Sequence, residues 1–212
     1  MAINRCDALM YQPKKYKKQD PEYIFKYIQQ HPFATFVIQQ QELQATHIPV
    51  LVEGNAEDFR LFSHIANHNE LFSALKNGAK ALLIFQGNHA YVSSSWYEQK
   101  DISTWDYSAV HVSVEIQLQT TAELENSLEK LVNHFEKDQE QPLCYKNLPK
   151  PLVNDHLPLI TGFWAKPLQV KAIAKHHQGS SKKNVKNVIQ HLSENGNTSL
   201  AQEIKNENLN ND

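Results

Sequence analysis

Hydrophobic residues near the start of the chain change from a helical to an extended spacing close to residue 33. Asp20 and Pro21 are typical of a helix start, and apolar residues then recur at helical spacing up to residue 28. His31 precedes a proline, a position that disfavours the α conformation, so the helix should end there. Apolar and β-branched residues then predict three closely spaced antiparallel strands, at 33–39, 43–52 and 59–65.

The remainder of the chain continues the alternation of strands and helices. Thr120 and Glu123 form a capping-box pattern, which predicts a helix ending near Lys137, and Ser181 can cap a later helix. The proline-containing segment 141–158 predicts a loop. Further helices are predicted at 67–78 and 181–192, and further strands at 80–87, at 104–119 and within 159–176.

This order of elements favours an α+β fold, an antiparallel barrel or curled sheet with peripheral helices. The βαβ alternation and the glycine-rich motifs of nucleotide-binding α/β folds are absent from the sequence. No break in composition marks a second domain, so we expect one domain over residues 1–195. The polar, Asn-rich segment 196–212 is expected to fray.

Composition and charge are those of an ordinary soluble globular protein. The chain has 212 residues, 41% of them hydrophobic and 21% charged, with a net charge of −2. This balance requires neither a nucleic-acid partner nor an anionic membrane, and the lysines at 14–18 give only a weak positive field. Cys6 and Cys144 form no CxxC motif, and no signal peptide or membrane span is apparent. We therefore expect a reduced, cytoplasmic protein.

The stretch at 89–111 combines aromatic rings with hydroxyls and imidazoles. Trp96, Trp105 and three tyrosines alternate there with serines, a threonine and two histidines. Such a mixture suits a flat ligand with polar edges, which needs a stacking surface and several hydrogen bonds. A polar barrel seam or a dimer interface would have a similar composition. The residues alone leave these alternatives open.

The segment 63–69 is a second candidate, for a phosphate group. It passes from a predicted strand into a predicted helix, and a helix N-terminus offers unpaired N–H groups to an anion. Ser63, Asn67 and Asn69 supply neutral hydrogen-bonding groups, whereas His64 and His68 supply charge only if protonated. The segment contains no Arg or Lys. A capped helix start with polar surface residues would have the same sequence.

Other chemistry has weaker support in the sequence. The eleven histidines are dispersed, and the i, i+4 pair His64 and His68 crosses a predicted strand-to-helix junction, so we expect no metal site. Ser93, Ser94 and Ser95 lie near a histidine, but the nucleophile-elbow motif GxSxG is absent. No residue stands out as a catalytic acid or base.

Two segments of the chain, HAYVSSSWY (89–97) and TWDYSAVH (104–111), carry its most specific motifs. Together with several other segments, they resemble the PaiB-like family of FMN-binding negative transcriptional regulators. The others are MYQPKKY (10–16), HPFATFV (31–37), ATHIPVLV (45–52), SHIANHNELF (63–72), LLIFQGN (82–88) and ITGFWAKPLQV (160–170), with Gln178 shortly after. The resemblance extends over residues 1 to about 195. It implies an antiparallel split β-barrel with peripheral helices, as in pyridoxamine-phosphate oxidases, and a homodimer with flavin at the subunit interface.

The resemblance also implies which residues contact FMN. The phosphate would lie near Thr46, His47, Ser63, His64, Asn67, His68 and Asn69. The flavin ring or the dimer seam would be lined by Ser95, Trp96, Tyr97, Trp105 and Tyr107, with Gln178 reaching in from the C-terminal segment.

This chain departs from the family pattern at several of these positions. Where the family has Gly-His-x-Ala-Arg-x-Asn-Pro, the arginine is replaced by Asn67 and the proline by Glu70. Where the family has Trp-Asn-Tyr, the middle residue is Asp106. Near the C-terminus, the family's Lys-Leu-Ser-Gln-Asn is Lys-His-His-Gln-Gly at 175–179. The phosphate side therefore lacks the family's cation.

Together, these observations predict an FMN-binding split-barrel protein with a regulatory role. The alternatives are a flavin-dependent reductase or oxidase of small molecules, and a haem-binding protein on the same barrel. Direct DNA binding is not supported, because the most basic helix, 181–192, carries only three lysines and needs its apolar face for packing.

Overall fold

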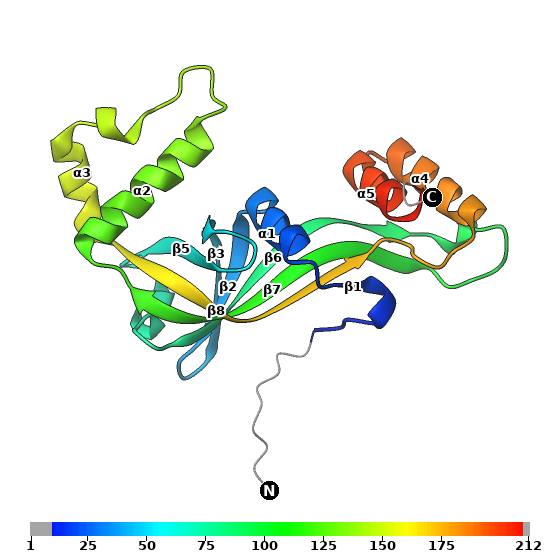
Figure 1. Cartoon of the computed structure of the whole chain (residues 1–212), viewed down its shortest axis with the longest axis horizontal. Helices are drawn as coiled ribbons and strands as arrows, with labels where there is room; N and C mark the ends of the chain where they lie inside the picture. Colours follow the sequence, from blue (N-terminus) through cyan, green and yellow to red (C-terminus); the bar gives the residue numbers. More distant parts are fainter. Residues whose placement is uncertain (1–9, 210–212) are drawn as a thin grey trace, which may run out of the picture. The chain divides into compact units, whose positions relative to one another are not determined.

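The computed structural model describes residues 10–209, and this part forms two compact units (Figure 1). Unit 1 contains the described residues up to Ile24, Gln86–Val110 and the described residues from Lys171 onward. Unit 2 contains Phe25–Phe85 and His111–Val170. Three long strands contribute residues to both units. The single domain expected over residues 1–195 stays a prediction.

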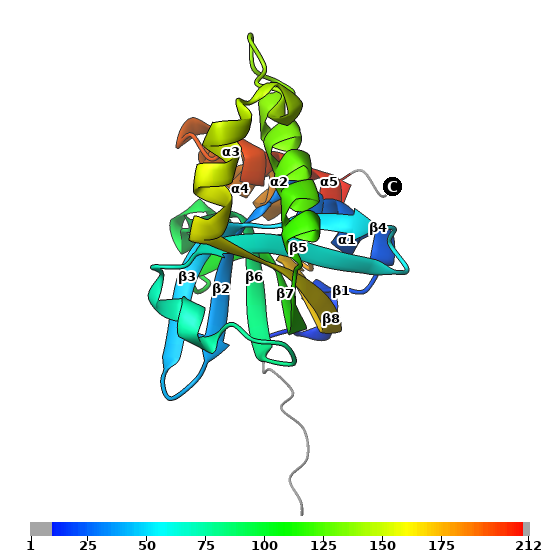
Figure 2. The same cartoon turned by 90° about the vertical axis from the view of Figure 1, so that its left-hand side faces the viewer.

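Within residues 10–209, eight strands form an antiparallel sheet in the order β3-β2-β6-β7-β8-β5-β4, with β1 paired to β8. The antiparallel α+β fold with peripheral helices is confirmed. The strands are β1 (Lys17–Lys18), β2 (Phe33–Gln39), β3 (Leu43–Pro49), β4 (Leu51–Gly54), β5 (Phe59–Ala66), β6 (Lys80–Val92), β7 (Thr104–Leu118) and β8 (Ile160–Lys175). Figure 2 shows β3, β2 and β6 side by side within unit 2.

One strand predicted at 43–52 is two strands in the structure. β3 pairs with β2, whereas β4 pairs with β5, so the chain changes its partner between Pro49 and Leu51. Proline has no N–H to offer a neighbouring strand, and the N–H of Val50 instead donates to the carbonyl of Pro32 at 2.7 Å. The break at residue 50 follows from these two features.

In the described part of the chain, five α-helices accompany the strands: α1 (Pro21–Gln30), α2 (Thr121–Glu136), α3 (Lys150–His156), α4 (Lys182–Glu194) and α5 (Thr198–Leu209). Short 3-10 helices are η1 (Lys14–Tyr16), η2 (Glu70–Ala74), η3 (Ser94–Trp96), η4 (Tyr145–Asn147) and η5 (Leu157–Leu159). The predicted capping box of Thr120 and Glu123 is present, and Ser181 caps α4 by accepting from the N–H of Asn184 at 3.2 Å.

Two of the predictions for helices and loops were wrong. The helix predicted at 67–78 is the five-residue η2, in which few peptide dipoles align. The loop predicted at 141–158 contains η4, α3 and the start of η5. Pro151 and Pro158 lie in the first turns of α3 and η5, where a missing N–H is tolerated, so these prolines start helices.

The core of unit 2 is built from the inward faces of the strands. Phe36 and Phe163 stack with ring centroids 5.4 Å apart, and both are fully buried. Leu61, Leu83 and Ile116 are also inaccessible to solvent. Arg60 lies over the Trp164 ring at 3.6 Å, and the Trp164 indole donates to Glu123 at 3.1 Å, which fixes the start of α2 against β8.

In unit 1, α4 and α5 lie side by side and pack on the distal half of β6 (Figure 1). Val92, Val188, Leu192 and Ile204 are at most 1% exposed. The segment 196–212 was expected to fray, and this prediction was wrong for residues 198–209, which form α5. Its apolar residues recur at helical spacing and are covered by α4, so burial offsets its polar composition.

Candidate functional site

The predicted phosphate segment begins on β5, where Ser63 and His64 are held in the sheet. Ser63 is 2% exposed, and its hydroxyl donates to the carbonyl of Pro49 at 2.6 Å. His64 pairs with Gly162 of β8, and burial lowers the pKa of its imidazole. A neutral His64 and an occupied Ser63 hydroxyl give β5 little capacity to hold an anion.

The amides that follow β5 also serve the fold. Asn67 donates through Nδ2 to the carbonyl of Pro158 at 2.8 Å and accepts at Oδ1 from Thr161 at 2.7 Å. Asn69 caps η2 by accepting from the N–H of Leu71 at 2.9 Å. His68 lies between these two residues with an exposed side chain. It is therefore the most available group of the segment.

Strand β3 lies beside β5 and η2, so the structure brings Thr46 and His47 to the same region of unit 2. The His47 side chain is exposed and stacks on Phe33, with ring centroids 5.9 Å apart. Thr46 is half-buried. The described residues 63–69 contain no Arg or Lys, so the polar groups gathered here are neutral or imidazole.

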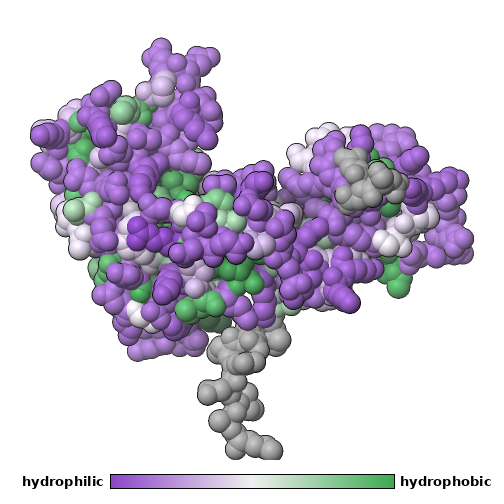
Figure 3. Space-filling view, in the orientation of Figure 1, coloured by the Kyte–Doolittle hydropathy of each residue, from purple (hydrophilic) through white to green (hydrophobic). Residues whose placement is uncertain are grey.

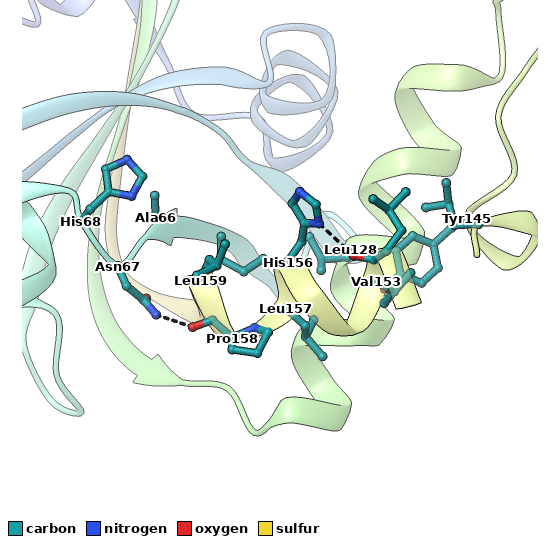
Figure 4. A pocket seen from close by; sticks show the side chains of 13 residues that line it. Ala66, Asn67, His68, Leu128, Tyr145, Val153, His156, Leu157, Pro158 and Leu159 are labelled. Carbon is teal, nitrogen blue, oxygen red and sulfur yellow. Dashed lines mark hydrogen bonds between the residues drawn. The ribbon is translucent and has the colours of Figure 1, made fainter. Parts of the chain in front are cut away.

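A pocket of about 720 Å³ lies where β5 ends, between α2, η4, α3 and η5 (Figure 4). Asn67 and His68 reach its margin from the predicted phosphate segment. Most of the lining is aliphatic, and the two histidines of the lining are His68 and His156 (Figure 4). The apolar side chains of the lining include Leu128, Leu148, Leu152, Val153, Leu157, Leu159 and Ile160.

The aromatic stretch presents an open surface in unit 1, which we call the aromatic platform and define as His89, Tyr91 and Trp105. The indole N–H of Trp105 donates to Nδ1 of His89 at 3.2 Å. The Tyr91 ring lies 6.3 Å from the Trp105 ring. Trp105 and Tyr91 are each about half exposed, at 50% and 51%. These side chains come from adjacent strands, β6 and β7.

Other predicted residues of this stretch pack against the C-terminal segment. Trp96 stacks on His191 of α4 with centroids 5.0 Å apart, and Tyr97 lies 5.4 Å from the ring of His177. Tyr107 packs on the cluster of Tyr16, Ala109 and Ile173.

The remaining two predicted residues form local hydrogen bonds. The Ser95 hydroxyl is exposed and lies 2.8 Å from that of Ser93. The Gln178 amide donates to the carbonyl of Ala174 and accepts from the N–H of His176, at 2.7 and 2.8 Å.

A buried ion pair lies behind the aromatic platform, on the opposite face of β7. Asp106 is fully buried, with Oδ2 3.0 Å from Nδ1 of His177 and Oδ1 3.8 Å from the Lys175 ammonium. His177 has a positive φ of 65°, which is uncommon for a residue with a side chain. Burial, followed by the nearby Asp106 charge, raises the pKa of Tyr97 to about 12. Tyr97 therefore stays protonated beside this pair.

Within residues 10–209, no three His, Cys, Asp or Glu side chains are grouped closely enough to hold a metal ion. Cys144 is a free thiol, and Cys6 lies outside the described residues. None of the described helices combines the length and apolar character needed to cross a membrane.

The fold and the sequence together place this chain among known proteins. Residues 10–166 match the family described as "Putative FMN-binding domain". The chain belongs to this family. It is 31% identical over 184 residues to Protease synthase and sporulation protein PAI 2 of Bacillus subtilis (strain 168), covering 86% of this chain and 89% of that protein. The predicted resemblance to the PaiB-like family is confirmed.

Solved structures of other members of this fold class are similar in architecture. The FAD and haem binding protein from Mycobacterium smegmatis has a TM-score of 0.57 at 14% identity and covers 81% of this chain and 79% of its own. The flavocytochrome Anf3 from Azotobacter vinelandii has a TM-score of 0.54 at 14% identity, with 78% and 73% covered. This chain therefore has the split-barrel fold that its sequence predicted.

Sequence reasoning missed two features of these sites and left a third incomplete. His89 and Tyr91 were placed in the candidate stretch at 89–111 but not among the flavin contacts, although their alternation along one strand indicates a shared face. The pairing of Asp106 with His177 joins residues 71 positions apart, so no local pattern indicates it. The pocket depends on η4, α3 and η5, and its residues Leu148, Leu152 and Leu157 fell within the predicted loop at 141–158.

Proposed function

We propose that this protein binds a flavin nucleotide, as its family description indicates, and acts as a homodimeric regulatory protein. The observation that carries the proposal is the aromatic platform, a half-exposed indole held by a hydrogen bond to His89. A fixed aromatic face with polar groups at its edge suits the isoalloxazine ring. The flavin, when bound, would supply hydride-transfer chemistry.

The aromatic platform fits a flavin ring better than segment 63–69 fits a phosphate group. Trp105 offers a ring face, and Nε2 of His89 carries the proton of the neutral imidazole because Nδ1 accepts from Trp105. On the phosphate side, His68 and His47 are exposed imidazoles without a neighbouring Arg or Lys in 63–69. Charge-assisted bonds are about twice as strong as neutral ones, so the ring should contribute more of the affinity here.

Regulation through a metabolite or a partner protein fits the surface better than direct DNA binding does. Helices α4 and α5 are joined by a three-residue turn at 195–197, an arrangement used by some DNA-binding proteins. However, the exposed face of α5 has Lys205 as its cation, and Glu203 and Glu207 lie on the same helix. A phosphate backbone would meet little positive charge there.

A redox enzyme on the same barrel is the second candidate, and it is favoured by the same open platform, where a small substrate could approach a bound flavin ring. Turnover of NAD(P)H by the flavin-loaded protein would identify it. A haem protein is less compatible with His89, because its neutral ring carries the proton on Nε2 while Nδ1 accepts from Trp105. A Soret band in the purified protein would nevertheless assign that function.

The ring site is tested by measuring the FMN affinity of the unchanged protein, of one tryptophan variant and of one tyrosine control variant. Trp105→Leu should weaken FMN about tenfold, the effect of losing one aromatic stacking contact. Tyr11→Leu is the matched control, because Tyr11 is 64% exposed in unit 1 but is not part of the platform. Equal FMN affinity of folded Trp105→Leu and the unchanged protein would contradict the proposed ring site.

The phosphate side is tested by comparing FMN with riboflavin, which lacks the phosphate. We expect less than a tenfold preference for FMN, and a further decrease of that preference in His68→Gln. A preference of a hundredfold or more would show a strong phosphate site that segment 63–69 does not explain.

A further inference from the structure

The pocket at the end of β5 exposes apolar surface that the fold does not cover. Leu152 and Leu159 line it and are 45% and 57% exposed. Figure 3 shows hydrophobic surface in the region of α2 and α3. The volume of about 720 Å³ lies within the range of small-molecule sites, whose walls are mostly apolar with a few placed polar groups.

The polar groups of the pocket restrict the chemistry of a ligand. Its thirteen lining residues include no Asp, Glu, Lys or Arg. The amide of Asn67 is occupied at both ends by Pro158 and Thr161. The Tyr145 hydroxyl, which is buried without a hydrogen-bond partner, and the imidazoles of His68 and His156 are therefore the polar side-chain groups left for recognition.

The hydrogen bond of His156 defines what its free nitrogen can do. Nδ1 lies 2.8 Å from the carbonyl oxygen of Leu152, and a carbonyl can only accept, so Nδ1 carries a proton. Nε2 of the neutral ring is then an acceptor, and it becomes a donor when the ring is protonated. A carboxylic acid matches both states, as an acid O–H donating to neutral Nε2 or as a carboxylate accepting from the imidazolium.

We propose that this pocket binds an apolar carboxylic acid, with its hydrocarbon part against the leucines of α3 and η5 and its carboxyl group at His156. The absence of carboxylates from the lining removes repulsion of the head group. The absence of Lys and Arg makes the pocket a poor site for the phosphate dianion of a flavin nucleotide. Asn67 and His68 belong both to this lining and to the predicted phosphate segment, whereas the carboxyl contact at His156 lies outside that segment. The acid site therefore differs from the proposed flavin site, and it supplies an input for the regulatory function, on which this inference rests.

The test uses octanoate and 1-octanol as probes, titrated calorimetrically into the full chain at pH 6. Octanoate should occupy one site per chain. It should bind about tenfold more tightly than 1-octanol, because the alcohol replaces the charge-assisted hydrogen bond of the carboxylate with a neutral one. His156→Gln should abolish that preference. Absence of saturable octanoate binding, or equal affinities for the two probes, would overturn the proposal.

Two matched leucine variants locate the site. Leu152 lines the pocket and is 45% exposed, whereas Leu143 lies outside it and is 47% exposed. Both tolerate a polar replacement because both already face solvent. Leu152→Asp should weaken octanoate at least tenfold, and Leu143→Asp should leave it unchanged. Equal effects of the two substitutions would place octanoate elsewhere and overturn the proposal.

A competition experiment separates this site from the flavin site. FMN is titrated into protein with and without saturating octanoate, and the FMN affinity should be the same in both. Mutually exclusive binding would show that one pocket takes both ligands and would overturn the assignment of a separate site.

Discussion

The residue pair Asp106 and His177 shows how one buried charge can determine the stability of a local region. Asp106 is fully buried, and its neighbours are the imidazole of His177 at 3.0 Å and the ammonium of Lys175 at 3.8 Å. Burying a carboxylate is costly, and these partners compensate it. Lys175 also donates to the hydroxyl of Thr104 and to the carbonyl of Trp105, so the pair ties β8 to the strand that carries the aromatic platform.

Replacing Asp106 by Asn should therefore destabilise the protein strongly. The substitution leaves the Lys175 ammonium without its carboxylate partner and changes the hydrogen bond to His177, and breaking a buried pair in this way costs about 3 kcal/mol. The free energy of unfolding, measured by urea denaturation, should fall by that amount. Asp101→Asn is the control, since Asp101 is exposed. A change below about 0.5 kcal/mol in Asp106→Asn would contradict the assigned role of the pair.

Two half-buried histidines of unit 2 should make stability depend on pH. Burial lowers the pKa of His64 and of His111 below the ordinary 6.5. The unfolded chain then binds more protons than the folded one as the pH falls through about 6.5, so stability decreases with acidification. The stability of His64→Gln should fall less than that of the unchanged protein between about pH 7.5 and pH 5.5.

The measurement is urea denaturation at both pH values, with His47→Gln as control because His47 is exposed on β3. The control should follow the unchanged protein. If His64→Gln also loses as much stability as the unchanged protein on acidification, His64 does not titrate in the way its burial implies.

Single residues were predicted from the sequence with uneven success. The caps at Thr120 and Ser181 are local patterns, and both were identified. The contacts of Ser63 and Asn67 depend on Pro49 and Pro158, which lie distant in the chain, so their structural use could not be read locally. The phosphate site assigned to these residues stays a prediction.

At the level of elements, hydrophobic spacing identified the strands more reliably than the short helices. Strands β2, β5 and β7 lie close to their predicted ranges. Helix α3 was missed because its prolines suggested a loop, although Pro151 occupies a starting position. Helix α5 was missed because its many Asn and Glu residues masked an apolar stripe at Leu200, Ala201 and Ile204. This apolar stripe is buried against α4, and that contact cannot be read from the sequence of α5 alone.

Helix α5 should contribute to stability as part of a packed core. Ile204 is fully buried among residues of α4 and β6, so Ile204→Ala removes packed methyl groups and should cost about 3 kcal/mol. Lys205→Ala is the control, because Lys205 is the next residue of the helix and its side chain is exposed. Urea denaturation compares the two. An unchanged free energy of unfolding for Ile204→Ala would contradict the packing of α5 against α4.

At the scale of the whole molecule, the sequence predicted the fold because closely spaced hairpins and peripheral helices leave few alternatives. The antiparallel order of the strands and the family match over residues 10–166 agree with that prediction. The pocket was less predictable, because its lining joins segments from Ala66 to Ile160 that are far apart in sequence, whereas the aromatic platform lies within one stretch on two consecutive strands. The spacing of hydrophobic residues predicts individual helices and strands. Predicting a site also requires knowing how these elements pair and pack in space.

The visible absorption spectrum of the purified protein, recorded after FMN is added and the excess is removed, tests flavin binding most directly. We expect retained flavin bands in the unchanged protein and a smaller retained fraction in Trp105→Leu, whose platform lacks the indole face. A colourless, folded protein that retains no FMN would contradict flavin binding by this chain.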